Sequence, residues 1–180
     1  MHEHEQVLAF WFTEIDPKLW WAVDPAFDAD LRTRFLPLLQ QAARGELFRW
    51  RDTPRGRLAE VIVLDQFSRN IFRETPRAFA QDALALALAQ EAVAAGALAP
   101  LAAVERAFLL LPYMHSESAL IHTEAEPLFQ QWAPPGNYDF ERRHKAIIDR
   151  FGRYPHRNRI LGRASTPEEE AFLTQPGSSF

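Results

Sequence analysis

The stretch RLAEVIVLDQFSRNIFR, residues 57–73, predicts a helix that carries charged side chains on its buried face. Leu58 and Val61 mark the apolar face of this helix. Asp65 lies seven residues after Leu58 and four after Val61, so it shares that face, and Arg69 follows four residues later, within reach of Asp65. Because an unpaired buried charge costs several kcal/mol, we expect Asp65 and Arg69 to form an ion pair. The alternative is that Asp65 lines the edge of a ligand pocket.

The same helical periodicity extends over nearly the whole chain. Several helices begin with a capping residue followed by proline, as at Asp24-Pro25 and Thr53-Pro54. Short loops favour antiparallel packing of neighbouring helices, so the predicted fold class is all-α, with about eight antiparallel helices in a compact bundle. The expected helices cover residues 3–13, 25 up to the glycine at 45, 54–71, 76–96, 100–111, 115–117 to just before 133, 138–151, and a short last helix from 167.

Composition limits the class of protein. A chain of 180 residues, 47% of them hydrophobic, fits a single domain over residues 1–180. The chain has no cysteine, which excludes disulfides, thiolate metal sites and thiol catalysis. The N-terminal sequence MHEHEQVLAFWF is acidic where a signal peptide would be basic, and no apolar run approaches the roughly 20 residues of a membrane helix. We therefore expect a soluble, cytoplasmic protein with no membrane partner.

Basic residues are concentrated near the C-terminus. From Glu141 to Arg163 there are eight Lys/Arg against two acids, although the whole chain has a net charge of −4. Five arginines fall in RFGRYPHRNRILGR, residues 150–163. A sequence pI of 5.9 argues against nucleic-acid binding, which usually requires a basic total. Arginine suits partly buried, bidentate contacts with carboxylates or phosphates. The plausible partners within the chain are Asp65, Asp82, Glu105 and Glu117.

The five arginines are expected to divide into two classes. Arg150 and Arg153 flank the end of a helix and should lean inward, toward acids of other helices or into a cleft. Arg159 and Arg163 flank Ile160 and Leu161 and should be more exposed.

Two histidines invite a chemical interpretation. His144 lies on an apolar stripe with Phe140 and Ile147, which is typical of a hydrogen-bonded core residue. In PYMHSES, residues 112–118, Pro112 should end or kink one helix and Ser116 could cap the next, with Glu117 in its first turn. This explanation leaves His115 without a role. Adjacency of His, Ser and Glu in the sequence is no evidence for a hydrolytic triad, whose members meet in space. The candidate metal ligands, which are His115, Glu117, His144 and His156, lack the i, i+4 spacing of a helical zinc site.

Three polar segments are expected to meet in space: LDQFSRN (64–70), PYMHSE (112–117) and RFGRYPHRN (150–158). Each places charged or hydrogen-bonding side chains beside aromatic or aliphatic ones. Such groups need partners that their own neighbours do not offer.

Five stretches of the chain resemble the DUF924 family, whose function is uncharacterised. They are VLAFWF, LAEVIVLDQFSRNIFR, TPRAFAQD, ERAFLLLPYMHSES and HKAIIDRFGRYPHRNRILGRASTPEEEAFL, and they follow the family order over nearly the whole length. The resemblance implies an all-α fold similar to that of tetratricopeptide-repeat (TPR) proteins. It implies no activity, substrate or catalytic residue.

Three functional hypotheses follow. The first is a binding module with an Arg/His-lined cleft for an anionic small molecule or an acidic peptide. The second is an enzyme that acts on a small phosphorylated or carboxylated substrate, with His115 or His156 as general acid or base. The third is purely structural, with every arginine paired internally. No cofactor or metal is expected, and the oligomeric state stays open. The candidate ligand-binding residues are Arg69, Asn70, Arg73, His115, Glu117, His144, Arg150, Arg153, His156, Arg157 and Asn158.

Overall fold

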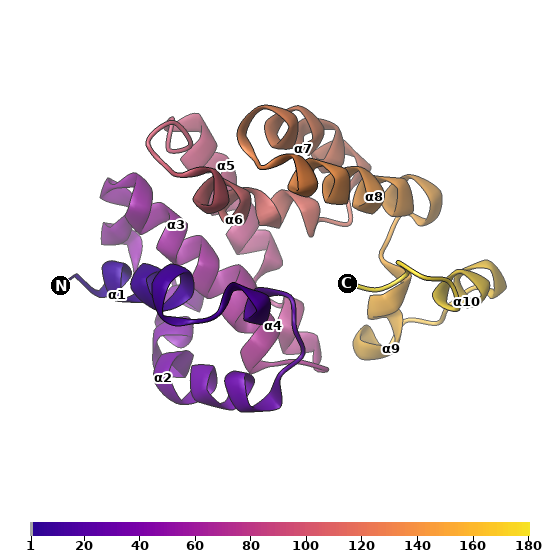
Figure 1. Ribbon diagram of the computed structural model, residues 1–180. Coiled ribbons are helices and arrows are strands. Elements are labelled where there is room, and N and C mark those ends of the chain that lie inside the picture. The colour runs from indigo at the N-terminus through magenta and orange to yellow at the C-terminus, as the bar shows by residue number, and fades with distance from the viewer. Residues whose placement is uncertain (1) are drawn as a thin grey trace.

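The computed structural model describes residues 2–180, which form helices and loops without a strand (Figure 1). One helix spans α3, the π-helical turn η4 and α4, because the backbone stays right-handed helical where they join. Counted in this way, the described residues contain nine α-helices, close to the expected number, and the predicted all-α class is confirmed. The helices are α1 (Glu3–Ala9), α2 (Pro25–Ala43), α3 (Pro54–Ile62), α4 (Ser68–Ile71), α5 (Asp82–Ala94), α6 (Ala103–Met114), α7 (Ala119–Trp132), α8 (Pro135–Phe151), α9 (Asn158–Leu161) and α10 (Pro167–Leu173), with the shorter turns η1 (Phe10–Glu14), η3 (Phe48–Asp52), η4 (Val63–Phe67), η5 (Pro76–Phe79) and η6 (Pro155–Arg157).

The helix that begins at Pro54 starts as the sequence predicts. The Thr53 side chain accepts a hydrogen bond from the Gly56 amide at 3.0 Å, and Pro54 occupies the first helical position. Turn η3 approaches this helix so closely that a Cβ atom at position 56 would lie 1.9 Å from the Trp50 carbonyl oxygen. Glycine at 56 therefore allows η3 to pack against α3.

The main core lies between the first six helices and α7. Phe10 and Trp11 at the start of η1 are fully buried and contact Phe67 from the α3–α4 helix. The continuous apolar face of α6 adds Phe108, whose ring packs edge-on against Trp11. No helix among the described residues is both long and apolar enough to cross a membrane.

A second, much smaller apolar cluster lies between α8 and the C-terminal segment, which we define as residues 152–180. Ile147 and Ile148 of α8 pack against Tyr154, with Phe151 and Phe172 alongside. Helices α9 and α10 lie beyond the end of α8, and the last residues return from α10 toward the helical body (Figure 1). The C-terminal segment therefore needs additional contacts to hold it against the main core.

Several expected helix boundaries are wrong. Helix α6 starts at Ala103 rather than at residue 100, and α8 starts at Pro135 rather than at residue 138. Helix α6 continues through Pro112 to Met114, because a proline in the last turn removes only its own hydrogen bond. The helix expected from Pro76 begins with the short turn η5, and α5 starts only at Asp82. Helix α7 starts at Ala119, so Ser116 does not cap it and Glu117 lies before its first turn.

Candidate functional site

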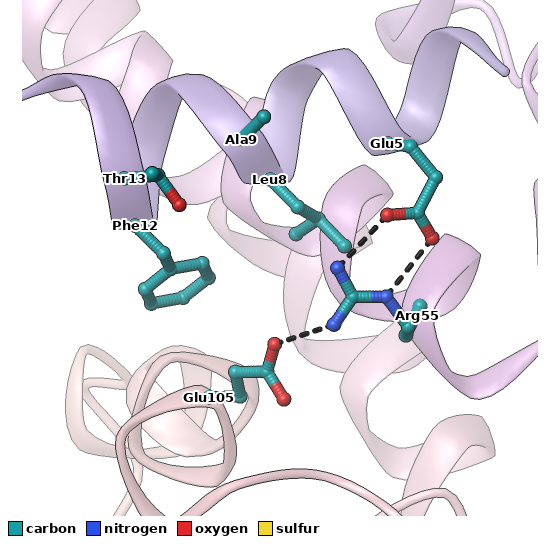
Figure 2. Close-up of a pocket in the computed structure, with 7 residues that line it drawn as sticks. All are labelled: Glu5, Leu8, Ala9, Phe12, Thr13, Arg55 and Glu105. Carbon is teal, nitrogen blue, oxygen red and sulfur yellow. Dashed lines mark hydrogen bonds and ion pairs between the residues drawn. The ribbon is translucent and has the colours of Figure 1, made fainter. Parts of the chain in front are cut away.

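A groove of about 470 Å³ lies between α1, η1 and the first residues of α3 and α6 (Figure 2). It is an open surface groove rather than an enclosed cavity. None of the candidate residues named from the sequence lines it. The lining residues are Glu5, Leu8, Ala9, Phe12, Thr13, Arg55 and Glu105.

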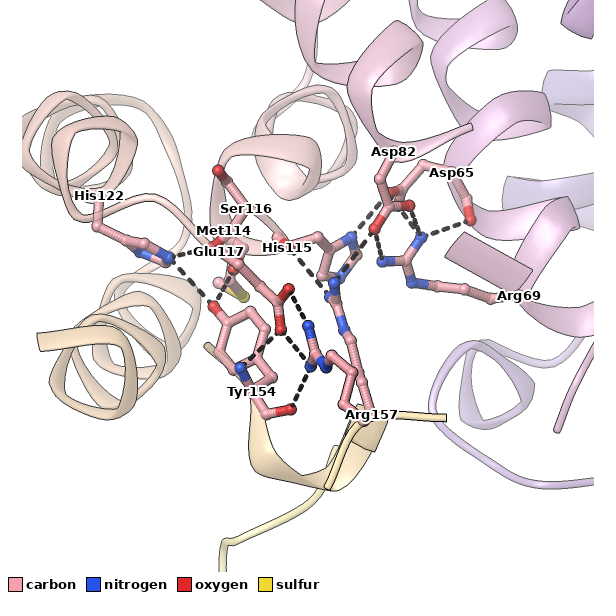
Figure 3. Close-up of polar contacts among 11 residues, drawn as sticks. Asp65, Arg69, Asp82, Met114, His115, Ser116, Glu117, His122, Tyr154 and Arg157 are labelled. Atoms are coloured by element: carbon pink, nitrogen blue, oxygen red, sulfur yellow. Dashed lines mark hydrogen bonds and ion pairs between the residues drawn. The ribbon is translucent and has the colours of Figure 1, made fainter. Parts of the chain in front are cut away.

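The predicted Asp65–Arg69 pair is present, and it extends to a second carboxylate (Figure 3). Arg69 Nη1 donates to Asp65 Oδ1 at 3.0 Å and to Asp82 Oδ1 at 2.7 Å, and Nη2 donates to Asp82 Oδ2 at 3.0 Å. The Asp65 side chain is only 1% exposed. Burial by itself raises the pKa of Asp65, but the Arg69 guanidinium and the His115 ring outweigh it and hold this pKa well below its usual range. Asp65 is therefore a buried, fully ionised carboxylate.

His115 is oriented by the same carboxylate. Its Nδ1 lies 2.7 Å from Asp65 Oδ1, across the 50 residues that separate them in sequence. Burial lowers the pKa of His115, and the Arg69 cation lowers it further, so the ring is neutral at pH 7. A neutral ring donates Nδ1–H to the carboxylate and keeps its lone pair on Nε2. No hydrogen-bond partner for that Nε2 occurs among residues 2–180.

Arg157 brings the C-terminal segment to this centre. Its Nη2 donates to the His115 carbonyl oxygen at 2.9 Å, and Nη1 lies 3.4 Å from Asp82 Oδ2. The guanidinium carbon lies over two aromatic rings, 4.6 Å from the centre of Phe79 and 4.8 Å from that of Tyr154. The three segments LDQFSRN, PYMHSE and RFGRYPHRN therefore meet, as the sequence predicts. We call Asp65, Arg69, Asp82, His115 and Arg157 the central network.

Glu117 forms a second link to the C-terminal segment. Its carboxylate accepts a 2.7 Å hydrogen bond from the Tyr154 amide and a bidentate pair, at 2.7 and 2.9 Å, from Arg163. The expectation that Arg163 is exposed is therefore wrong. Gly162, with a left-handed backbone at φ +68°, reverses the chain after α9 and turns Arg163 back toward Glu117.

Of the other three arginines in residues 150–163, Arg150 and Arg159 lie at the surface. Arg150 was expected to lean inward, but its side chain is 48% exposed and pairs with the exposed Glu168. Its position in the last turn of α8 points it along the outside of α10. Arg153 does lean inward, with bonds of 2.7 and 2.8 Å to Glu169. Arg159 is 77% exposed, as expected.

The remaining candidates lie around the central network rather than in it. Asn70 and Arg73 both donate to Asp28 of α2, at 2.6 to 3.0 Å. Asn158 donates to Glu169 and Ser165 and accepts from Arg163. His144 is a buried core residue whose Nδ1 bonds the Phe140 carbonyl at 2.7 Å, as predicted.

His156 lies among rings. Its ring centre is 5.9 Å from that of Tyr154 and 4.5 Å from that of Phe180, and its Nδ1 is buried without a partner. Burial lowers the pKa of His156 to about 4, so its ring is neutral at pH 7.

Sequence reasoning missed a pair of completely buried ionisable residues. His122 Nδ1 lies 2.6 Å from Glu141 Oε1, and both side chains have no exposed surface. His122 Nε2 donates to the Ser116 carbonyl at 2.8 Å and lies 3.1 Å from the Tyr154 hydroxyl, which donates to the Met114 carbonyl. Helical spacing could have revealed His122, because it shares one face of α7 with Ala125 and Phe129.

The ion pairs of the candidate arginines bear on the three functional hypotheses. Each of the five candidate arginines has a carboxylate partner in the structure. For Arg69, Arg73, Arg150 and Arg153 the contacts favour a structural role. Across residues 2–180 there is no cluster of three or more His, Asp or Glu side chains arranged to hold a metal ion.

Comparisons with known proteins support the resemblance. The model of the family described as DUF924, "Bacterial protein of unknown function", matches residues 7–177. A solved structure of a protein of unknown function from Agrobacterium tumefaciens is similar over 94% of this chain and 96% of its own, with 36% identity and a TM-score of 0.89. No protein with a curated function matches the chain.

Replacing Asp65 by alanine should lower the free energy of unfolding by about 3 kcal/mol, because the change strands the buried Arg69 and removes the partner of His115. Asp30→Ala is the matched control. Asp30 also pairs with an arginine four residues away, but it is 58% exposed, so its loss should cost less than about 1 kcal/mol. Urea unfolding of both variants measures the difference, and equal losses would show that the central network carries no special share of stability.

The buried histidines should make the fold sensitive to mild acid. Burial lowers the pKa of His144 to about 3, below the ordinary value of about 6.5 that it has when unfolded. Below pH 6.5 His144 therefore binds a proton in the unfolded state but not in the folded state, and stability is lost as the pH falls. Relative to His144→Asn, which cannot titrate, the wild type should lose about 1 kcal/mol between pH 7 and pH 5.5. A difference that does not change with pH would show that His144 titrates normally in the fold.

Proposed function

The chain belongs to the DUF924 family, and from the geometry around Arg157 we propose that it is a binding module for a small molecule or peptide that carries an anionic group. The proposal rests on the incomplete neutralisation of the Arg157 charge. Its Nη1 shares Asp82 with Arg69 at the long distance of 3.4 Å, and its Nε is buried without any partner.

The electrostatics of Arg157 differ from those of its neighbours. Burial lowers the pKa of Arg157, and the adjacent Arg69 cation lowers it further. Hydrogen bonds that Arg73 donates to Asp28 and Arg153 donates to Glu169 instead raise the pKa values of these two arginines. A guanidinium whose charged form is disfavoured gains most from an added anion.

Unfilled hydrogen-bonding positions lie on three neighbouring residues. They are Arg157 Nε, His156 Nδ1 and His115 Nε2. Arg157 bonds the His115 carbonyl directly, and His156 precedes it in the chain. Native proteins rarely leave buried polar atoms unpaired without a reason, and a bound anionic group would supply acceptors for Arg157 Nε and His156 Nδ1. His115 Nε2 carries a lone pair and cannot donate to an anion. The proposal thus reduces the anion-binding residues to Arg157 and His156 and leaves the other arginines as support.

The side chain of Phe180 lies at the edge of this region. Its ring centre is 3.7 Å from that of His144, 4.5 Å from that of His156 and 5.1 Å from that of Tyr154, yet it is 52% exposed. A half-exposed aromatic ring that covers histidines is held mainly by these contacts. Its displacement would expose His156, which precedes Arg157 in the chain, without disturbing the main core.

Catalysis is the second candidate, and it depends on His115. A neutral imidazole whose Nδ1–H is held by Asp65 and whose Nε2 is free has the arrangement of a general base. The same anionic substrate class would then be bound and turned over, and the His115→Gln variant would bind it without turnover.

We also propose a cytoplasmic location and a TPR-like arrangement of the helices, as expected from the sequence. Support for the arrangement comes from α5, α6, α7 and α8, each of which packs against the next in chain order. TPR-like arrangements generally present surfaces for partners.

Titration with sodium pyrophosphate, followed by NMR of the arginine Nε–H groups at constant ionic strength, tests the binding proposal. We expect the Arg157 Nε–H resonance to shift and saturate, whereas that of the exposed Arg159 should not. Pyrophosphate binding measured by calorimetry should be lost in Arg157→Lys and kept in Arg159→Lys. Identical, non-saturating shifts at both arginines would mean that the anion acts only through ionic strength, and the proposal would be wrong.

A further inference from the structure

We propose a second binding site, independent of Arg157, in the groove between α1 and α6. A basic helical segment of a partner protein docks in this groove. A Lys or Arg side chain of that segment approaches Glu5 and Glu105, and an apolar side chain packs against Phe12 (Figure 2). We call this the α1–α6 groove.

One wall of the groove is a stripe along a single helix. The residues that line it from α1 and η1 fall at positions 5, 8, 9, 12 and 13, which is the spacing of one helical face. The opposite side of the same helix carries Val7 and Trp11, which are buried in the main core. Helix α1 is thus fixed by its inner face, and its outer face forms a rigid wall for a ligand.

Three charges meet at one end of the groove and leave a negative excess. Arg55 donates to both carboxylate oxygens of Glu5 at 2.9 Å and to Glu105 Oε1 at 2.7 Å. The hydrogen bond from Arg55 lowers the pKa of Glu5, so its carboxylate is ionised at neutral pH. Two carboxylates against one guanidinium give a net charge of −1, which a cation from a partner would neutralise.

The segment that forms the α1–η1 wall has the same sign. Residues 1–16 contain four Asp/Glu and neither Lys nor Arg, and of these acids Glu14 is paired with Arg34 of α2. A field of one sign attracts a partner of the opposite sign and orients it before contact. Charge complementarity therefore assigns a basic occupant, and it argues against an acidic peptide at this site.

The other end of the groove is aromatic. Phe12 packs against Phe108 and Trp20, with ring centres 5.5 and 5.9 Å apart. Trp21 stacks on the other side of this group, 5.8 Å from Phe108 at an interplanar angle of 11°, and stays 64% exposed. Large exposed aromatic rings beside a groove are typical of surfaces that a partner covers.

The distance between the two ends fits a helix. Positions 5 and 12 are seven residues apart, which corresponds to about 10 Å along a helix axis. The helical segment of the partner contacts both ends of the groove when its cation and its apolar residue are also seven positions apart. This places the guest as an added helix in the groove between α1 and α6, the helix-in-groove mode of recognition.

Fluorescence anisotropy with two labelled peptides tests the assignment. Both are alanine-based helices with a leucine, and they carry either arginine or glutamate seven positions before it. We expect the arginine peptide to bind saturably, more weakly at high salt, and the glutamate peptide not to bind. The double variant Glu5→Gln/Glu105→Gln should weaken binding about ten-fold or more, because it removes the negative excess. Trp21→Ala, at a surface position, should weaken it as well.

Glu46→Gln provides the matched control, because Glu46 forms an exposed ion pair with Arg44 and does not line the groove. It should leave affinity unchanged. Equal binding of the two peptides, or full affinity in a folded Glu5→Gln/Glu105→Gln protein, would overturn the proposal. So would a protein that dimerises in sedimentation experiments and becomes monomeric on Trp21→Ala, since the groove would then receive a second copy of this chain. The Arg157 proposal survives any of these outcomes.

Discussion

The Asp82 carboxylate is shared by two guanidinium groups that come from distant parts of the chain, and this contact organises the molecule. Arg69 reaches it from the α3–α4 helix and Arg157 from the C-terminal segment. The C-terminal segment brings only a small apolar cluster of its own. Buried charges tolerate few alternative arrangements, because a misplaced one is left unpaired at a cost of several kcal/mol. The central network thus fixes where residues 152–180 dock, while the aromatic core stabilises the remainder.

The sequence predicted those features that depend on spacing along one helix. Asp65, Arg69 and His144 were placed correctly because helical periodicity determines which face a residue occupies, and burial then requires a partner for a charge. Proline after a capping residue marked the start of α2 and of α3. The meeting of three distant segments followed from the same requirement, since none of them could satisfy its polar groups locally.

Features that depend on the direction of the chain after a turn were not predictable in this way. The roles of Arg150 and Arg163 were exchanged, because left-handed glycines at 152 and 162 redirect the backbone between them. Glu117 was assigned to a helix start, whereas its partners, the Tyr154 amide and Arg163, lie beyond those turns. The α1–α6 groove was missed because its walls come from helices whose relative placement depends on the core.

Polar contacts, rather than apolar packing, hold the C-terminal segment in place. Native-state hydrogen exchange in the Glu117→Ala variant is the decisive measurement, because this change removes the acceptor of the Tyr154 amide and the partner of Arg163. We expect the amides of Tyr154 and of α9 to exchange through an opening of lower free energy than in the wild type, while those of α3 keep their protection. An equal loss of protection in α3 and α9, or no loss in either, would show that apolar packing holds the segment.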